Sequence, residues 1–353
     1  MLNHSLLKQL SDLSSISSRE KTISSYLEDI YRTNNIDFSY DNLGSIIGVI
    51  NNDKRLKKIM IDAHMDEVGF IVKEIDSKGF IYLQTIGSWW SHMLLGQVMV
   101  VTTKDNKSYY GVIGSPATHG ISAEIKNKTV DINSIYLDMG VSDSQEIEYL
   151  GIKIGDMVTP KSDYMIMNNE NYICNKAFDD RIGTYILIEL FKELSNFDYN
   201  TLYLANSVQE EPGLRGARTT TYKIAPDIAF AIDTTLSGDT PYNKNSCQLG
   251  KGVVISLLDS NSIANRKLVK YVEGIASINK IPFQYAVFNQ GGTDSGNIHK
   301  TLEGVISLTL SIPIRYMHTA HSMINVLDVQ ACIDLLKDII LDLNDEKITE
   351  IGG

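Results

Sequence analysis

Apolar positions along the chain change their periodicity twice, and these changes divide the sequence into two kinds of region. Up to residue 67 and again from residue 163, short apolar runs typical of buried strands alternate with longer stretches of helical spacing. Alternating strands and helices predict an α/β fold with helices on both faces of a sheet. The expected strands include 46–50, 58–66, 201–209, 227–233, 253–259, 282–288 and 304–310, and the expected helices include 22–33, 180–195, 265–278 and 327–344.

The region between residues 68 and 162 has a different texture. Short β-type runs follow one another, separated by turns of Gly, Asp, Asn and Lys, with little helical signal. We therefore expect a discontinuous α/β domain, residues 1–67 and 163–353, interrupted by an inserted all-β domain, residues 68–162. A length of 353 residues agrees with two domains, because single cores stop growing at about 250–300 residues. The β-type runs are 69–75, 80–87, 97–103, 109–114, 134–141 and 155–160.

The N-terminal segment predicts helices rather than a targeting signal. LLKQL has helical spacing, and Ser17 with Glu20 has the spacing of a capping box before the helix expected from Thr22. Polar residues run through MLNHSLLKQLSDLSS, and no later run approaches the ~20 apolar residues of a membrane span. We expect a cytoplasmic protein.

Composition and charge narrow the possible partners. With 43% apolar and 21% charged residues, the chain has an ordinary globular composition. Its net charge of −11 argues against nucleic acid and against an anionic membrane surface as partners. The cysteines Cys174, Cys247 and Cys332 lie far apart and form no CxxC pair, so we expect buried thiols in a reducing compartment.

Metal-binding residue types recur where the apolar strands end. In open α/β sheets, sites gather at the carboxyl ends of strands. Carboxylates and imidazoles in these numbers suit two divalent ions plus an unliganded general base, which is the equipment of a two-metal hydrolase. These residues are His64, Asp66, Asp179, Glu210, Glu211, Asp233 and His318.

Two of these segments also have structural explanations. His64 and Asp66 lie two residues apart, so both side chains leave the same face of a strand, and Asp66 could orient the imidazole. A histidine satisfied in a turn would have the same sequence. Asp179 and Asp180 precede an expected helix, where capping explains one carboxylate and Arg181 could pair with the other.

The Glu210–Glu211 pair ends the strand 201–209 and is followed by Pro212 and Gly213, which stop it. Neighbouring strand residues point to opposite sides. A bend here would therefore give one glutamate as a metal ligand and the other as a general base. A solvated acidic turn is the alternative, but the shared placement of all the segments argues against a surface explanation for every one of them.

Six motifs together resemble those of the TET-type metallo-aminopeptidases, a family that includes glutamyl aminopeptidase and proteins labelled cellulase M or endoglucanase. They are AHMDEVGF, KAFDDRIG, VQEEPGLRGA, the AIDTT…GDTP stretch, GGTDSGNIH and RYMHT, and they run in order over nearly the whole chain. The resemblance implies a mixed sheet interrupted by an all-β dimerisation domain. It also implies dimers that assemble into a hollow tetrahedral dodecamer, with peptides as substrates.

The resemblance further implies two zinc or cobalt ions per subunit. Asp179 falls on the bridging aspartate of the family. His64 and Asp233 would complete one ion's ligands, and Glu211 and His318 would complete those of the other.

The remaining roles and the specificity also follow from the resemblance. Glu210 matches the general base on the metal-bridging water, and Asp66 matches the carboxylate that orients the first imidazole. His321 competes with His318 as a ligand, but His318 is favoured because it follows RYM as the family ligand does. HTAHSMIN is closer to the glutamyl branch, so we expect a preference for acidic (Glu or Asp) N-termini; leucyl and lysyl preferences occur on the same scaffold.

Other reaction classes stay open. A dimetal deacylase or carboxypeptidase on the same scaffold would require a free carboxylate rather than a free amine on its substrate. A glycoside hydrolase also uses paired carboxylates, but it leaves His64 and His318 without a task. A non-catalytic assembly protein is a poor alternative, because no expected ligand is missing.

Overall fold

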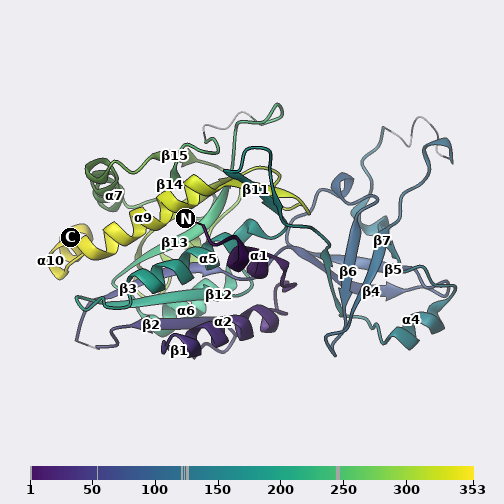
Figure 1. Cartoon of the computed structure of the whole chain (residues 1–353), viewed down its shortest axis with the longest axis horizontal. Helices are drawn as coiled ribbons and strands as arrows, with labels where there is room; N and C mark the ends of the chain where they lie inside the picture. The colour runs from purple at the N-terminus through teal and green to yellow at the C-terminus, as the bar shows by residue number, and fades with distance from the viewer. Residues whose placement is uncertain (1, 54, 121, 123, 125–126, 244–246) are drawn as a thin grey trace.

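The computed structural model places a β-barrel beside a larger α/β body that contains both ends of the chain (Figure 1). The barrel strands begin at Gly69 and end at Pro160, inside the residues expected for an inserted domain. The structure describes residues 2–53, 55–120, 122, 124, 127–243 and 247–353.

A mixed sheet organises the α/β body, with the strand order β1-β2-β12-β3-β13-β16-β14-β15. The central strands β12, β3, β13 and β16 run parallel to one another, whereas β2 and β14 pair antiparallel to this group. The predicted mixed α/β fold is therefore confirmed. The strands are β1 Asp37–Tyr40, β2 Ile46–Ile50, β3 Lys58–His64, β12 Thr201–Ser207, β13 Ile228–Leu236, β14 Val253–Leu258, β15 Phe283–Val287 and β16 Ile306–Ile314.

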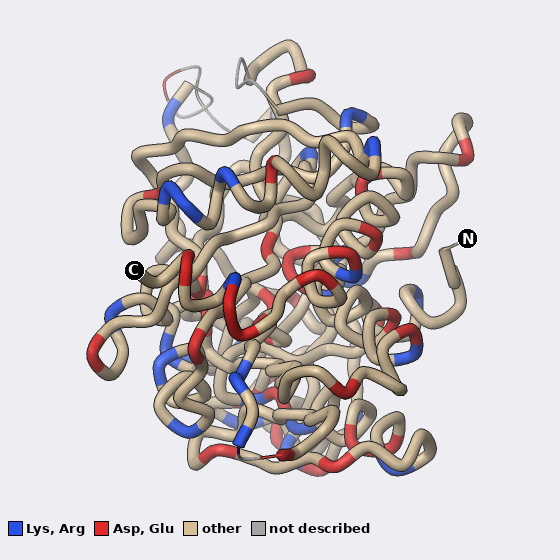
Figure 2. The backbone as a smooth tube through the Cα atoms, turned by 90° about the vertical axis from the view of Figure 1, so that its left-hand side faces the viewer, with Lys and Arg blue, Asp and Glu red and all other residues tan. Residues whose placement is uncertain are grey.

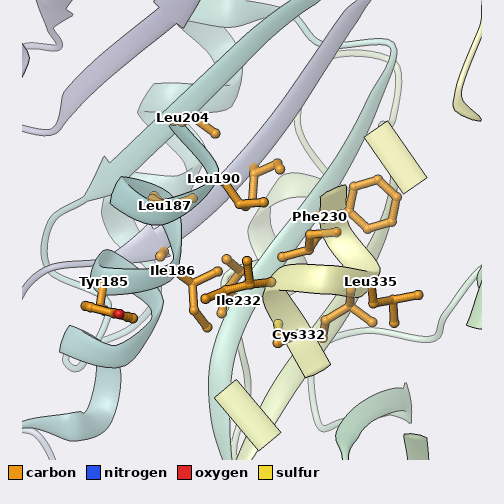
Figure 3. Close-up of a cluster of buried hydrophobic side chains, with 14 of the residues drawn as sticks. Tyr185, Ile186, Leu187, Leu190, Leu204, Phe230, Ile232, Cys332 and Leu335 are labelled. Atoms are coloured by element: carbon orange, nitrogen blue, oxygen red, sulfur yellow. The ribbon is translucent and has the colours of Figure 1, made fainter. Parts of the chain in front are cut away.

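Residues alternate along the central strands and fill a separate core on each face of the sheet. Ile232 packs in one core with Ile186 of α5 and Cys332 of α9 (Figure 3). Its neighbour Ala231 packs in the other core with Ala217 of α6, where small side chains let the helix approach the sheet. The helices are α1 His4–Asp12, α2 Lys21–Thr33, α5 Phe178–Glu193, α6 Arg215–Ile224, α7 Arg266–Asn279, α8 Ser295–Ile298, α9 Val326–Asp342 and α10 Asp345–Gly352.

The barrel closes in the order β4-β5-β8-β7-β6-β9 around its own apolar core. The prediction of little helix is wrong at α4, Ser144–Leu150. Asp143 caps this helix by accepting the backbone N–H groups of Gln145 and Glu146, and Gly151 ends it at a φ of 81°. The strands are β4 Gly69–Ile75, β5 Ile81–Ile86, β6 Val98–Thr102, β7 Ser108–Ile113, β8 Tyr136–Asp138 and β9 Met157–Pro160, and the 3₁₀ turns are Ser91–Met93, Thr118–Gly120 and Ile132–Ser134.

A small antiparallel sheet, β10-β11-β17, was not predicted from the sequence. Its strands are too short for a periodicity of two residues to be recognised. They are β10 Met165–Ile166, β11 Tyr172–Asn175 and β17 Ser322–Asn325.

The register of the large sheet brings the ends of its central strands together. His64, the last residue of β3, pairs with Ser207, the last residue of β12. Asp62 of β3 pairs with Ala231 of β13, and Asp233 lies two residues further along β13. The side chains at these positions, and those that follow β3 and β12, therefore converge at one edge of the sheet.

The surface carries charges of both signs. Figure 2 shows Lys and Arg interspersed with Asp and Glu over the α/β end of the molecule. Cys174, Cys247 and Cys332 are all buried. Among the helices in the described part of the chain, none has the length and apolarity needed to cross a bilayer.

Candidate metal centre

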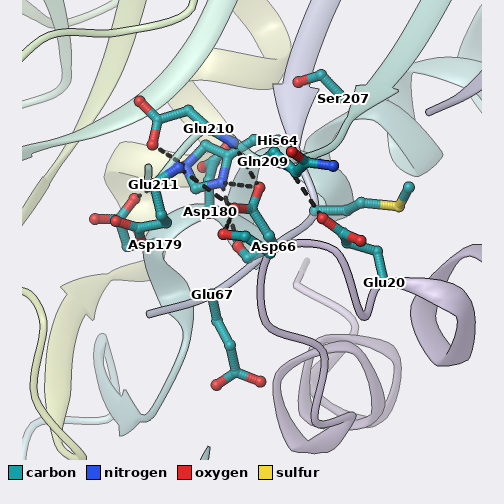
Figure 4. A network of polar contacts seen from close by, with 12 residues as sticks. Glu20, His64, Asp66, Glu67, Asp179, Asp180, Ser207, Gln209, Glu210 and Glu211 are labelled. Carbon is teal, nitrogen blue, oxygen red and sulfur yellow. Dashed lines mark hydrogen bonds and ion pairs between the residues drawn. The ribbon is translucent and has the colours of Figure 1, made fainter. Parts of the chain in front are cut away.

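The buried imidazole of His64 lies between two carboxylates. Its Nδ1 is 3.4 Å from Oδ1 of Asp66 and 3.2 Å from the backbone oxygen of the same residue. Its Nε2 is 3.4 Å from Oδ1 of Asp179 (Figure 4). Nε2 therefore faces the centre of the cluster, and the Asp66 carboxylate lies on the far side of the ring, where it can orient it.

Asp179 connects two imidazoles that come from distant parts of the chain. Its Oδ1 faces His64, and its Oδ2 is 3.3 Å from Nε2 of His318. It belongs to the first turn of α5, and its peptide bond to Asp180 is cis. One carboxylate oxygen therefore points toward each half of the cluster, as a bridging ligand requires.

Arg181 does not pair with either neighbouring aspartate, although the sequence allowed this. Its buried guanidinium donates to the backbone oxygens of Met65 and Leu10 at 2.8 and 2.5 Å, and it also contacts Glu67 at 3.6 Å. Asp180 accepts the Gly183 N–H at 3.0 Å through Oδ1. Arg181 therefore joins the N-terminal segment to the end of β3. Burial raises the pKa of Asp180 well above the ordinary range, whereas the contacts with His318 and His64 lower the pKa of Asp179 despite its burial.

Glu210 and Glu211 face different imidazoles. Oε2 of Glu210 is 3.8 Å from Nε2 of His64, and Oε2 of Glu211 is 3.5 Å from Nε2 of His318. The bend expected after β12 is present, because the preceding residue, Gln209, has a φ of 56°. Two adjacent carboxylates thus lie in the two halves of one site, one near each imidazole.

The last two predicted ligands complete the cluster. Asp233 is buried on β13 and groups with His64 and Glu210. His318 groups with Asp179 and Glu211, while its competitor His321 is exposed and lies outside both groups.

Within each group, the candidate ligand atoms lie within 4.8 Å of one another. The groups touch through Asp179 and His64, whose Oδ1 and Nε2 are 3.4 Å apart. The seven residues singled out from the sequence therefore come together at one site, with Asp66 behind the first imidazole.

The model of the M42 glutamyl aminopeptidase family matches residues 44–335, which is most of the chain. The chain belongs to the M42 family. It is accordingly a peptide hydrolase, and the enzymes of this family use two metal ions.

M42 relatives with different named specificities resemble the chain to a similar degree. The glutamyl aminopeptidase of Lactococcus lactis is 30% identical over 352 residues, covering 98% of both chains. The lysyl aminopeptidase of Pyrococcus furiosus is 31% identical over 349 residues, covering 97% of this chain and 98% of its own. FrvX of Escherichia coli K12, a candidate aminopeptidase by name, is 32% identical over 350 residues, covering 98% of this chain and 97% of its own.

Solved structures resemble the fold over nearly its full length. The TET aminopeptidase from a Thaumarchaeota archaeon has a TM-score of 0.94 at 32% identity and covers 98% of this chain and 99% of its own. The TET1 peptidase of Pyrococcus horikoshii, described as assembling into a tetrahedron or a large octahedral shell, has a TM-score of 0.85 at 29% identity and covers 96% of this chain and 99% of its own.

The electrostatics of the M42 site call for added positive charge. Burial and the nearby carboxylates raise the pKa of Glu210 and of Asp233 well above the ordinary range, despite the opposing effect of His64. Burial, together with Asp179, raises the pKa of Glu211 to about 7. Burial lowers the pKa of His318, but the charge of Glu211 and the contact with Asp179 outweigh it and bring that pKa to about 9. All of these shifts favour protonation, so the carboxylates outnumber the cations available to them.

The donor set fits two divalent cations. Oxygen and imidazole nitrogen are ligands that zinc and cobalt share. Oε1 of Glu211 is buried and has no hydrogen-bond partner among the residues that the structure describes, although the other oxygen of that carboxylate approaches His318. A buried carboxylate oxygen without a donor is costly, and a bound cation removes that cost.

A cavity of about 310 Å³ opens beside the site, and Asp179, Glu211 and His318 form part of its lining. Concave pockets of this kind are where small ligands generally bind. Leu236, Phe288 and Met317 contribute apolar surface to its lining. Among the described residues, no Lys or Arg lines it, whereas Asp259 does. Beyond the ligand groups, the cavity therefore presents one fixed negative charge to the substrate.

Sequence analysis missed a buried polar cluster next to the site. The hydroxyl of Ser207 lies 3.0 Å from Oδ2 of Asp62 and 2.8 Å from Oδ2 of Asp294. Burial and the mutual proximity of the two carboxylates raise the pKa of Asp62. Asp62 lies two residues before His64, so strand alternation was a usable signal; the link to Asp294 spans the whole fold and was not.

The predicted capping box at Ser17 and Glu20 is wrong, although the helix it announced exists. Glu20 makes no side-chain cap to α2. Instead, the Ser17 hydroxyl donates to Oδ2 of Asp66 at 2.5 Å, and Oε1 of Glu20 accepts the Gln209 N–H at 3.2 Å. Both side chains turn toward the metal centre rather than toward the helix.

Proposed function

We propose that this M42 enzyme removes single N-terminal residues from peptides at a site built for two divalent ions. The observation that carries the proposal is the position of Asp179, with one carboxylate oxygen 3.4 Å from His64 Nε2 and the other 3.3 Å from His318 Nε2. A carboxylate placed in this way can hold two cations at the 3.5–4 Å separation that two-metal hydrolases use.

The proposed ligands divide into two sets that share Asp179. His64 and Asp233, which group together with Glu210, complete one set, and Glu211 and His318, which group with Asp179, complete the other. Asp66 orients His64 from behind the ring. When bound, the ions supply a Lewis acid for the scissile carbonyl, an anchor for the free amine and a lowered pKa for the attacking water, and zinc and cobalt both meet this need.

Glu210 is the proposed general base. It is buried, and its Oε2 is 3.8 Å from His64 Nε2, at the margin of the first ligand set. A carboxylate with a raised pKa is suited to take a proton from water near neutral pH and to return it to the leaving amine. Glu211, facing the other imidazole, remains free to act as a ligand.

Two features bear on the N-terminal residue preference, and they favour different residues. The sequence around His318 favours acidic residues, as in the glutamyl branch. Asp259 instead favours a lysyl preference, because Asn261, Ser262 and Thr293 donate to its carboxylate and fix its charge at the cavity. Among the described residues, no Lys or Arg lines the cavity to offset that charge.

One experiment tests both the reaction class and the preference. Glu-, Asp-, Leu-, Lys- and Ala-p-nitroanilides are compared with their N-acetylated forms. An aminopeptidase cleaves only the free amines, and the ranking of Glu against Lys decides the preference. Release of acetate from N-acetylated amino acids, or shortening of peptides only from the carboxyl end, would instead assign a deacylase or carboxypeptidase.

We also propose that residues 68–162 form a dimerisation domain and that dimers assemble into a tetrahedral dodecamer, as TET relatives do. On one outer face of the barrel, Val98 pairs with Val112, and Val100 with Tyr110. Val98, Tyr110 and Val112 are 40%, 65% and 45% exposed. Adjacent exposed apolar side chains of this kind mark an interface.

Light scattering tests this assembly. The native chain should have a mass well above one subunit, and Tyr110→Asp should lower it. Tyr149→Asp is the control, because Tyr149 is 93% exposed on α4 of the same barrel and lies outside that face. An unchanged mass for Tyr110→Asp would remove the β6–β7 face from the interface.

A further inference from the structure

Three successive backbone N–H groups at the catalytic turn donate to carboxylates from distant segments. The Gln209 N–H donates to Oε1 of Glu20 at 3.2 Å, and the N–H groups of Glu210 and Glu211 donate to Oδ1 and Oδ2 of Asp66 at 3.0 and 3.3 Å. Figure 4 shows Glu20 and Asp66 on the same side of this turn. The two acidic side chains thus hold the backbone that carries the proposed base and one proposed ligand.

The turn depends on such support because its first residue has an unfavourable conformation. Gln209 has a φ of 56°, in the left-handed region that a non-glycine residue adopts only at a cost in free energy. This residue follows shortly after β12 and directs the next two side chains to His64 and His318. Relaxation of Gln209 would rotate Glu210 and Glu211 away from these positions.

Burial of the Glu20 carboxylate beside Gln209 costs free energy, and the contacts that Glu20 makes within its own segment do not explain this burial. It is only 6% exposed, and within the described residues it takes part in no ion pair. Burial and the nearby charge of Asp66 raise its pKa to about 7. Its local contact is the Ser18 N–H at 2.7 Å, and its long-range contact is Gln209.

Ser17 connects the segment that carries Glu20 to the carboxylate of Asp66. Its hydroxyl donates to Oδ2 of Asp66, the oxygen that also accepts the Glu211 N–H. The segment from Ser17 to Glu20 therefore contacts both Asp66, which orients His64, and Gln209, which precedes the two glutamates. A shift of this segment would move residues in both halves of the site.

We infer that Glu20 is a positioning residue for catalysis, which holds Gln209 in its left-handed conformation and thereby sets the direction of Glu210 and Glu211. The inference rests on the proposed roles of those two glutamates. Glu20 touches neither the substrate cavity nor the ligand groups, so its effect passes through the backbone.

Three substitutions at Glu20 distinguish the effect of side-chain length from the effect of the carboxylate charge. Glu20→Ala removes the acceptor, Glu20→Asp keeps the charge but is one methylene too short, and Glu20→Gln keeps an oxygen acceptor of the right length. We expect kcat to fall about 10- to 100-fold in the Ala and Asp variants, the cost of a misplaced group, with KM within about twofold. Glu20→Gln should recover most of the wild-type kcat.

Asp328→Ala is the matched control. Asp328 is also buried, and its two oxygens accept the N–H groups of Gly250 and Gly252, each at 2.7 Å, away from the substrate cavity. This variant should lower the melting temperature and leave kcat unchanged. If Glu20→Ala behaved in the same way, Glu20 would be merely structural.

Two further outcomes would also overturn the inference. Glu20→Asp with wild-type kcat would exclude reach as the determinant, and Glu20→Gln as impaired as Glu20→Ala would show that an oxygen acceptor of the right length does not suffice. The soluble Asp and Gln variants keep the comparison possible even if Glu20→Ala does not fold. Absence of peptidase activity in the metal-loaded wild-type enzyme would instead contradict the proposed function.

Discussion

Oδ1 of Asp66 accepts the backbone N–H of Glu210 at 3.0 Å, and the same oxygen lies 3.4 Å from Nδ1 of His64. One buried carboxylate thus joins a proposed metal ligand on β3 to the proposed base after β12. Burial opposes ionisation of Asp66, but His64, Ser17 and the Glu210 N–H lower its pKa below the ordinary value. It therefore stays charged while orienting the ring.

Removal of this carboxylate should damage metal binding and turnover together. Asp66→Ala leaves His64 without its orienting partner, and loss of such a partner costs about 10- to 100-fold in metal affinity. Titration of chelator-treated enzyme with Zn²⁺ measures this effect, and kcat at saturating metal measures the effect on Glu210. Wild-type affinity and kcat in the variant would exclude Asp66 from both roles.

Glu210→Gln should separate metal binding from catalysis. The amide cannot accept the proton, so kcat should fall about 10²- to 10⁴-fold, while both ions stay bound. Metal analysis of the purified variant and a p-nitroanilide assay test this prediction, with the exposed Glu303→Gln as the control. Near-normal turnover would remove Glu210 from the base role.

The two histidines after β16 should behave differently. His318 groups with Asp179 and Glu211, whereas His321 is exposed. His318→Ala should therefore lose one of two bound ions and most of its activity, and His321→Ala should match the wild type in both. The reverse result would transfer the ligand role to His321.

Stability should depend on pH through Glu20. Its pKa rises from 4.5 to about 7 on folding, so the folded chain binds more protons than the unfolded chain between these values. Stability contributed by this group is therefore lost as pH rises from about 4.5 to 7, by at most about 3 kcal/mol. Glu20→Gln lacks this penalty, so its melting temperature relative to wild type should increase over that window. A constant difference across the window would contradict the raised pKa.

The clustering of the candidate residues was predictable because they lie toward the carboxyl ends of parallel strands, which meet at one edge of a sheet. His64 is the last residue of β3 and the glutamates follow β12, whereas Asp233 lies inside β13, which continues to Leu236. The role of Glu20 was not predictable, because its spacing from Ser17 fits a local capping box. Its actual partner is Gln209, which is 189 positions away.

Local signals were also overlooked or insufficient elsewhere. The helix α4 has an Asp cap and a terminal Gly that were readable in SDSQEIEYLG, but the surrounding β pattern obscured them. The hydrogen bonds from Ser207 to Asp62 and Asp294 depend on the register of β3 with β12 and on α8 packing near them, which no single segment encodes.

The most direct test of the account is metal reconstitution of the chelator-treated enzyme, following bound metal and cleavage of a free-amine aminoacyl-p-nitroanilide in one titration. The account predicts no activity without metal, two Zn²⁺ or Co²⁺ ions bound per subunit and full activity only when both are present. It also predicts that Asp179→Asn binds the ions weakly and stays inactive. Full activity without metal, or an Asp179→Asn variant that binds two ions and turns over normally, would contradict a dimetal site built on Asp179.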